Sequence, residues 1–367
     1  MKISIGSKII EGPWGGGNLF AINLSNYLAE KSNDVIYDLS EPDIDLILLT
    51  DPRSRSESSS TFNHIDILKY KKYVNPNVSV VQRINECDER KNTSNINDFY
   101  LEASQVADHV VFVSKWLQDI YINKGMDKDK TSVILAGANP DIFTFSINDF
   151  EEEHTNLKIV THHWSSHFNK GFKIYKLIDE LIDTERFKDK IEFTYVGNYQ
   201  EEYNLKNTKI VKPLFGKELA NELKKHDIYV TGSLNEPSGN HHIEASQSGL
   251  PVMYINSGGI PEYCEGFGVE FDEINFEERL IYLKNNLLKY RKNLENYPFN
   301  SDKMSSEFYA LFKSLINSRQ KSKVEKISLI GYFYLKKNKY SNKFRMFSNI
   351  KSKVSSIFKL RFKNEYQ

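Results

Sequence analysis

Short runs rich in valine and isoleucine alternate with longer amphipathic stretches along most of this chain, and this alternation restricts the folds open to it. The apolar runs lie at residues 3–5, 46–49, 78–81, 110–113, 133–135, 159–161, 191–196, 228–231 and 252–255. Runs of this kind are typical of strands buried in a parallel sheet. The stretches between them predict helices at residues 18–31, 98–107, 115–124, 171–182 and 217–225. The sequence therefore predicts an α/β protein built from doubly wound parallel sheets.

One polar, acidic segment, SINDFEEEHTNL at residues 146–157, interrupts the alternation and is predicted to be a linker. A chain of 367 residues has room for two ordinary domains. We expect boundaries at 1–155 for the first domain, 156–300 for the second, 301–320 for a C-terminal helix that crosses back to the first domain, and 321–367 for a basic, aromatic tail. Two such domains in series leave a cleft in which two substrates can meet.

Charge is distributed unevenly, although the formal net charge of the chain is zero. The tail at residues 321–367 carries 13 Lys and Arg against only Glu325 and Glu365. Aromatic side chains are interleaved with these cations, and this composition suits an anionic membrane surface. Nucleic acid is not an expected partner, because the rest of the chain is acidic. A flexible solubilising tail and an extra pair of packed helices are the structural alternatives.

Three features bear on cellular location. The two cysteines, Cys87 and Cys264, are too few for a disulfide framework, which favours a reducing compartment. The first residues, MKISIGSKII, lack the long apolar core of a secretory signal. No apolar run is long enough to span a bilayer as a helix. We expect a cytoplasmic protein that associates peripherally with the inner face of the cytoplasmic membrane.

The stretch EPSGNHHIE holds two carboxylates, Glu236 and Glu244, after the predicted strand at 228–231. Ligands of doubly wound folds bind at this edge of the sheet. Gly239 lets the backbone approach a ligand, and the free N–H groups of a helix that begins near Asn240 suit a diphosphate. The carboxylate inside the helix can accept hydrogen bonds from the hydroxyls of a ribose, and the loop carboxylate from those of a sugar. In isolation, two glutamates would indicate only a turn and a solvated helix end.

Two further loops follow predicted strands. Residues 256–263, NSGGIPEY, would in isolation indicate an ordinary glycine-rich turn. Residues 80–90, VVQRINECDER, gather several charges in the first domain. We place Arg83, Asn85 and Glu86 on the wall of the cleft, the first two as contacts to the sugar or the diphosphate and the third as a contact to an acceptor hydroxyl. A solvated charged turn explains the same residues equally well.

Several motifs occur in the order found in one known family. They are GGG at 15–17, FVSKWLQDIY at 112–121, ILAGANPDIF at 134–143, EPSGNHHIE at 236–244 and SGGIPE at 257–262. Over roughly residues 1–320 the chain resembles the retaining glycosyltransferases of family 4, which have the GT-B fold. The specific part is the E-x7-E pair, because the glycine loops are weak signals alone. Ala136 stands where the family usually has an Asn.

The resemblance implies that the second domain binds a nucleotide-sugar donor and that the first domain binds most of the acceptor. By the family pattern, Glu244 binds the ribose hydroxyls, Glu236 faces the donor sugar, and Lys170 contacts the diphosphate. The family often has an arginine a few residues before this lysine. In that region this chain has His162, His163, Ser165 and His167.

The resemblance also implies a set of site residues. The expected catalytic residues are Lys170 and Glu236. The expected donor-binding residues are Gly15, Gly16, Gly17, Ser165, Lys170, Gly239, Asn240, His241 and Glu244. We expect no cofactor and no essential metal, because enzymes of this fold generally need none. The clustered histidines do not change this expectation, because adjacent histidines on a strand or helix point apart.

The function implied is that of a retaining hexosyltransferase. It would move a sugar from a nucleoside-diphosphate sugar to a hydroxyl of a glycan or lipid-linked acceptor, in surface polysaccharide or glycoconjugate synthesis. The alternatives are a catalytically silent sugar-nucleotide-binding partner and a sugar-nucleotide epimerase or phosphorylase of the same fold. An NAD-dependent dehydrogenase is disfavoured, because residues 12–17 lack the G-x-G-x-x-G order after the first strand.

Overall fold

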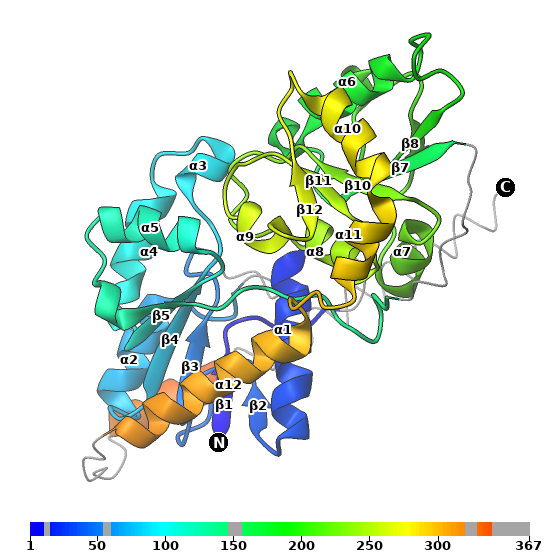
Figure 1. The fold of residues 1–367 in the computed structure, drawn as a ribbon. Helices are drawn as coiled ribbons and strands as arrows, with labels where there is room; N and C mark the ends of the chain where they lie inside the picture. Colours follow the sequence, from blue (N-terminus) through cyan, green and yellow to red (C-terminus); the bar gives the residue numbers. More distant parts are fainter. Residues whose placement is uncertain (11–14, 54–59, 146–155, 320–328, 340–367) are drawn as a thin grey trace, which may run out of the picture.

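Two parallel sheets, each flanked by helices, make up the computed structural model of this chain (Figure 1). The structure describes residues 1–10, 15–53, 60–145, 156–319 and 329–339. Most of the predicted linker and most of the predicted basic tail lie outside the described residues. The prediction of two doubly wound parallel α/β domains is confirmed.

The first sheet has the strand order β2-β1-β3-β4-β5-β6, and every pair of neighbours is parallel. Its strands are β1 Lys2–Ile5, β2 Asp34–Ile36, β3 Leu46–Leu49, β4 Ser79–Ile84, β5 His109–Phe112 and β6 Thr131–Val133. The helices of this part of the chain are α1 Gly16–Glu30, α2 His64–Tyr73, α3 Asp88–Lys91, α4 Ile96–Ala103 and α5 Lys115–Asn123. The residues of β3 and β4 are buried throughout, and β3 has the continuous apolar sequence that such burial favours.

The second sheet has the order β12-β11-β10-β7-β8-β9 and is also parallel. Its strands are β7 Leu157–His163, β8 Ile191–Gly197, β9 Lys209–Val211, β10 Ile228–Thr231, β11 Val252–Tyr254 and β12 Gly268–Glu270. The helices that follow β7 are α6 Phe172–Leu181, α7 Gly216–Leu223, α8 Asn240–Gln247, α9 Pro261–Cys264, α10 Phe276–Asn285, α11 Leu287–Leu294 and α12 Ser301–Ser318.

The strands that the sequence did not predict, β2, β9 and β12, all lie at a sheet edge. Each has three residues, of which at most one is buried, so none shows a continuous apolar run. The helix predicted at 98–107 is shorter than expected. It ends at Ala103, and a 3-10 turn follows at Ser104–Val106, where the Ser104 hydroxyl donates to the carbonyl oxygen of Leu101 at 2.6 Å.

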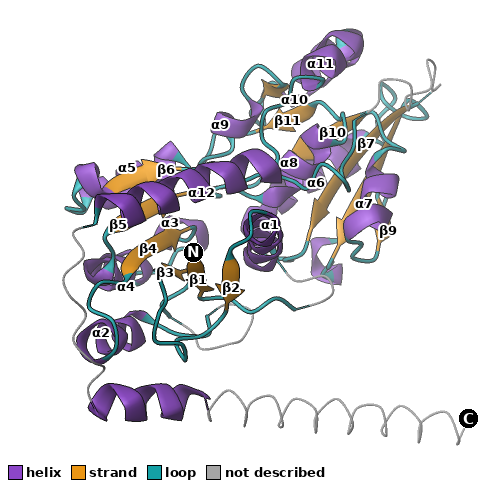
Figure 2. Ribbon diagram, turned by 90° about the horizontal axis from the view of Figure 1, so that it is seen from below, coloured by secondary structure: helices purple, strands orange, loops and turns teal. Residues whose placement is uncertain are grey.

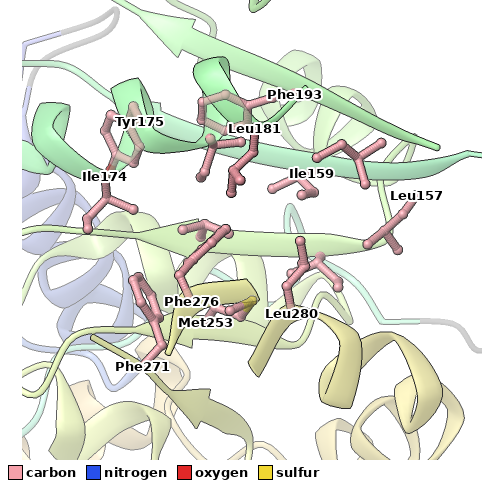
Figure 3. Packing of buried hydrophobic residues seen from close by; sticks show 14 of the residues in the cluster. Leu157, Ile159, Ile174, Tyr175, Leu181, Phe193, Met253, Phe271, Phe276 and Leu280 are labelled. Carbon is pink, nitrogen blue, oxygen red and sulfur yellow. The ribbon is translucent and has the colours of Figure 1, made fainter. Parts of the chain in front are cut away.

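The second domain has two clusters of buried apolar residues, and one of them lies between its sheet and the helices α6 and α10 (Figure 3). Ile174 and Tyr175 point inward from α6, and Phe276 and Leu280 point inward from α10. The sheet contributes Leu157, Ile159, Phe193 and Met253. This packing fixes the strands whose carboxyl ends lead into the candidate site.

Helix α12 follows the second domain in sequence but packs in the core of the first (Figures 1 and 2). Its Met304, Phe308 and Phe312 are buried against residues of the first sheet and of α1. The rings of Phe308 and Phe20 meet edge to face, with centroids 5.2 Å apart. The first domain therefore needs α12, which follows the second domain in sequence, to complete its core.

The chain crosses between the domains twice, and the two crossings touch. Ser301 donates its backbone N–H to the carbonyl oxygen of Ala138 at 2.8 Å, and Ala138 donates to that of Phe299 at 3.4 Å. A Cβ at Gly137 would lie 2.1 Å from the backbone carbon of Asn300, so only glycine fits there. Ala136 and Phe143, which precede β7, already pack in the core of the second domain.

Residues 329–339 form a helix on the first domain. Tyr334 and Leu335 pack against its core, and the Tyr334 hydroxyl donates to the carbonyl oxygen of Asp66 at 3.0 Å. Apolar side chains are exposed on this helix at Leu329, Ile330, Tyr332 and Phe333. Among the helices that the structure describes, none is long and apolar enough to cross a membrane.

Removing a buried side chain of α12 at its contact with α1 tests how much this helix contributes to the stability of the first domain. We expect Phe308→Ala to lower the free energy of unfolding by about 3–5 kcal/mol, because a large buried ring is removed. Urea unfolding followed by circular dichroism measures the change. Ser314→Ala, at an exposed position of the same helix, is the control and should change stability by less than about 0.5 kcal/mol. Equal effects of both variants would contradict the packing described.

Candidate active site

The loop that carries Glu236 leads from β10 into α8. Helix α8 begins at Asn240, and Gly239 precedes it with φ of 77°, a left-handed conformation that favours glycine. A Cβ at Gly239 would also lie 2.7 Å from Cε1 of His241. No side chain of the described residues caps this helix, so its first N–H groups are available to a ligand. Glu244 lies one turn inside α8, as the sequence indicated.

The second glycine loop packs directly against the first. Gly259 donates its backbone N–H to the carbonyl oxygen of Glu236 at 2.9 Å. Gly258 has φ of 68°, and a Cβ there would lie 2.4 Å from the same oxygen. Glycine is therefore required at these positions by close backbone contact, which holds the Glu236 loop in place.

The Glu236 carboxylate is buried and is paired with two cations. Its Oε2 accepts a hydrogen bond from Nζ of Lys170, and its Oε1 lies 3.4 Å from Nη2 of Arg90. Burial acts to raise the pKa of Glu236, but the charges of Lys170 and Arg90 outweigh it and lower the pKa to about 2. Glu236 is consequently ionised at neutral pH and is a weak base.

Lys170 reaches this position from the 3-10 turn Phe168–Lys170, which follows β7. Its side chain is 14% exposed. Burial lowers the pKa of Lys170, and Arg90 adds to this effect while Glu236 opposes it. A lysine that is paired with a carboxylate at a sheet edge can also pair with the phosphate of an incoming ligand.

Glu244 is buried and contacts the end of β7. Nε2 of His162 lies 2.9 Å from Oε2 of Glu244, so the imidazole donates to this oxygen. The backbone N–H of His162 donates in turn to the Tyr229 hydroxyl at 3.0 Å. One carboxylate oxygen is thereby fixed in position, which orients the other.

Three buried histidines form an uncharged wall next to the ion pair. Burial lowers the pKa of His163 and of His241 well below the usual value, and lowers that of His242 to about 3. His241 is 2.9 Å from the Thr231 hydroxyl, and the rings of His163 and His241 have centroids 4.5 Å apart. These side chains can form hydrogen bonds with a ligand but cannot neutralise its charge.

The glycines at 15–17 lie at the start of α1. Gly15 precedes the helix, and Gly16 and Gly17 belong to its first turn, two residues earlier than the predicted start. A Cβ at Gly16 would lie 3.2 Å from Oδ1 of Asn240. The amino ends of α1 and α8 therefore lie close together, one in each domain, and among the described residues neither has a side-chain cap.

On the first-domain wall, Arg83 is buried and stacks on Phe20, with its guanidinium carbon 4.0 Å from the ring centroid. Burial lowers the pKa of Arg83 to about 10. Within the part of the chain that the structure describes, Arg83 has no carboxylate partner. Asn85 is half-buried, and Glu86 is surrounded by cations of its own domain.

Not every predicted residue joins this cluster. Ser165 is exposed, and its hydroxyl accepts a hydrogen bond from the backbone N–H of His167 at 3.3 Å. Arg90, by contrast, was noted in its charged loop but was not predicted as a site residue. The sequence shows several charged residues after a buried strand. It does not indicate which of these residues reaches the other domain.

Glu262 was not predicted to join the two domains. Its carboxylate accepts hydrogen bonds from the backbone N–H groups of Lys115 and Trp116 at 2.7 and 2.8 Å, and so caps α5 of the first domain. A cavity of about 260 Å³ lies beside this contact and is lined by residues that include Glu262, Phe299 and Lys303. Neither Lys170 nor Glu236 lines it, and we place the candidate site at those two residues because the charged groups converge there.

Residues 166–286 match the family model described as "Glycosyl transferases group 1". The match lies in the second domain and includes Lys170, Glu236 and Glu244. Among curated proteins, no sequence matches this chain.

Solved structures share the fold over most of the chain. HepE from Anabaena, in complex with UDP and glucose, has a TM-score of 0.65 and 15% identity, over 85% of this chain and 99% of its own. A glycosyltransferase from Rickettsia africae has a TM-score of 0.61 and 15% identity, over 86% and 98%. Sucrose-phosphate synthase from Thermosynechococcus elongatus has a TM-score of 0.61 and 15% identity, over 86% and 99%. These likenesses show the GT-B fold, and together with the group 1 match they support a glycosyltransferase.

Replacement of Glu236 tests the buried ion pair. We expect Glu236→Gln to lower the free energy of unfolding at pH 7 by about 3 kcal/mol, because Lys170 and Arg90 lose their shared partner. The difference from wild type should shrink as the pH falls from about 5 to about 2, because the depressed pKa of this carboxylate makes its contribution disappear over that range. Urea unfolding at several pH values measures it. Glu277→Gln, in an exposed pair, is the control; a constant difference for Glu236→Gln would contradict the assignment.

Replacement of Arg83 tests whether its buried charge contributes to the stability of the fold. We expect Arg83→Met to melt at the same temperature as wild type or higher, because an unpaired buried cation is replaced by an apolar chain of similar length. Differential scanning calorimetry measures the change, with the exposed Arg186→Met as control. A fall in melting temperature of more than about 5 °C would assign Arg83 to the stability of the fold.

Proposed function

We propose that this protein is a retaining hexosyltransferase that moves a sugar from a nucleoside-diphosphate sugar to a hydroxyl of a glycan or lipid-linked acceptor. The observation that carries the proposal is the arrangement around the start of α8. Two carboxylates, Glu236 and Glu244, lie on either side of free helix N–H groups, and Lys170 is bound to the first of them.

Each part of the donor has a chemically suitable partner in this arrangement. The N–H groups at Asn240 and the charge of Lys170 suit the diphosphate. The oxygen of Glu244 that His162 does not engage suits the hydroxyls of the ribose. Glu236 suits the hydroxyls of the transferred sugar. The facing amino end of α1, with Gly16 and Gly17, supplies further N–H groups from the acceptor side.

The chemistry requires stabilisation of a departing nucleoside diphosphate and of positive charge on the sugar. Lys170 provides the first without a metal ion, and we propose that the reaction needs neither a metal nor a cofactor. The ionised Glu236 provides the second by its charge. A carboxylate with a pKa of about 2 is poorly suited to remove a proton from an alcohol. We therefore assign the acceptor's proton to the leaving phosphate, with attack from the same face of the sugar.

The acceptor is proposed to approach from the first domain, past Arg83, Asn85 and Glu86. A lipid-linked acceptor would bring the protein to the inner face of the cytoplasmic membrane. The helix at 329–339 supports this location, because it exposes four large apolar side chains and also contains three lysines. Surface polysaccharide or glycoconjugate synthesis is the corresponding pathway class.

A donor screen tests the proposal. Purified protein is incubated with a panel of UDP- and GDP-sugars, and release of the nucleoside diphosphate is measured. We expect release from one donor, and we expect Lys170→Ala and Glu244→Ala each to lower the rate by at least about a hundredfold, because a contact to the departing diphosphate or to the ribose is lost.

Lys173→Ala is the matched control for the lysine, because Lys173 lies on α6 in an exposed pair with Glu273. It should retain the wild-type rate. Nucleotide binding without release from any donor, even with candidate acceptors present, would favour a catalytically silent binding partner. Absence of binding by any donor would overturn the assignment of the donor site.

A further inference from the structure

Arg90 is a cation at the candidate donor site that comes from the other domain. It lies on α3 of the first domain (Figure 1), and its Nη2 is 3.4 Å from Oε1 of Glu236 in the second domain. Lys170 of the second domain binds the other oxygen of the same carboxylate. A phosphate that approaches Lys170 therefore approaches Arg90 as well.

The local structure fixes α3 at this position. Asp88, its first residue, accepts hydrogen bonds from two backbone N–H groups of α4 at 2.9 and 3.0 Å. The side-chain amides of Asn169 and Asn235 donate to the carbonyl oxygens of Arg90 and Glu89 at 3.4 and 3.2 Å. These two asparagines directly precede the lysine and the glutamate of the candidate site. The contact between α3 and the second domain is thus made by the same two loops that carry the donor-binding charges.

Two cations in this cluster share the single carboxylate of Glu236. Lys170 binds one of its oxygens, and Arg90 lies 3.4 Å from the other. An anion that enters beside Glu236 can therefore pair with both cations at once. A diphosphate has the charge and the oxygen geometry that such a cluster binds, and arginine can contact two phosphate oxygens at once.

We propose that Arg90 binds the β-phosphate of the nucleotide-sugar donor and supplies, from the first domain, the second cation of the diphosphate site. In the region just before Lys170, where the resembled family often has an arginine, this chain has histidines. Of the buried histidines at the site, His163 and His241 are uncharged, because burial lowers their pKa. This inference rests on the proposed function, in which Glu236 faces the sugar. The sugar is bonded to the β-phosphate, so a guanidinium that touches Glu236 lies next to that phosphate. The donor site is then complete only when the two domains are together.

A structural role for Arg90, limited to holding the domains together, predicts something different. Loss of Arg90 would then weaken the binding of every nucleotide to a similar extent, because it would act on the cleft as a whole. A contact to the β-phosphate affects only ligands that have one. The ratio of affinities for a diphosphate and a monophosphate therefore separates the two roles.

Titration calorimetry on the full-length protein measures this ratio. The probes are UDP and UMP, or GDP and GMP, according to the base found in the donor screen. For Arg90→Ala we expect the dissociation constant of the diphosphate to rise about tenfold to a hundredfold, because a charge-assisted contact is lost, and that of the monophosphate to stay within about twofold. Arg90→Lys keeps the charge without the planar fork and should give an intermediate value. Arg186→Ala removes an exposed arginine and should bind both nucleotides as wild type does.

Retention of monophosphate binding in Arg90→Ala also shows that this variant is folded. An equal loss for both nucleotides, or no loss for either, would overturn the assignment of Arg90 to the β-phosphate. Failure of the wild-type protein to bind any nucleotide would instead overturn the proposed function, and this result is obtained before any variant is made.

Discussion

The buried carboxylate of Glu236, shared by a cation from each domain, is the interaction on which the arrangement of the site depends. Removing a carboxylate from water is costly, but Lys170 and Arg90 outweigh this effect of burial and lower the pKa of Glu236 to about 2. The loop that carries it cannot move independently, because Gly258 and Gly259 pack against its backbone. The relative position of the two domains and the position of a donor-site side chain are therefore set by the same contacts.

The neighbouring histidines are uncharged, so Lys170 and Arg90 must supply the positive charge at this site. His163, His241 and His242 are buried together, and each would repel the charge of the others. They line the site with hydrogen-bonding groups while leaving the compensation of negative charge to Lys170 and Arg90. In such a site the histidines form hydrogen bonds with the ligand, and the two cations neutralise its negative charge.

The sequence predicts those features that a short segment determines by itself. Buried strands such as β3 are apolar throughout because helices cover both faces of the sheet, and the glycine at 239 marks the turn into α8. Edge strands such as β9 lack this signal because water reaches them. Contacts between distant segments are not encoded locally. The pairing of Arg90 with Glu236, and the capping of α5 by Glu262, depend on how two separately folded units meet.

The paired crossing at Gly137 and Asn300 has a mechanical consequence. The two segments that join the domains are held to each other by backbone hydrogen bonds and by close contact, so they resist sliding and stretching. A side chain at position 137 would push these segments apart. A glycine that carries no charge and touches no ligand group thus helps to set the spacing at which the charged loops of the two domains meet.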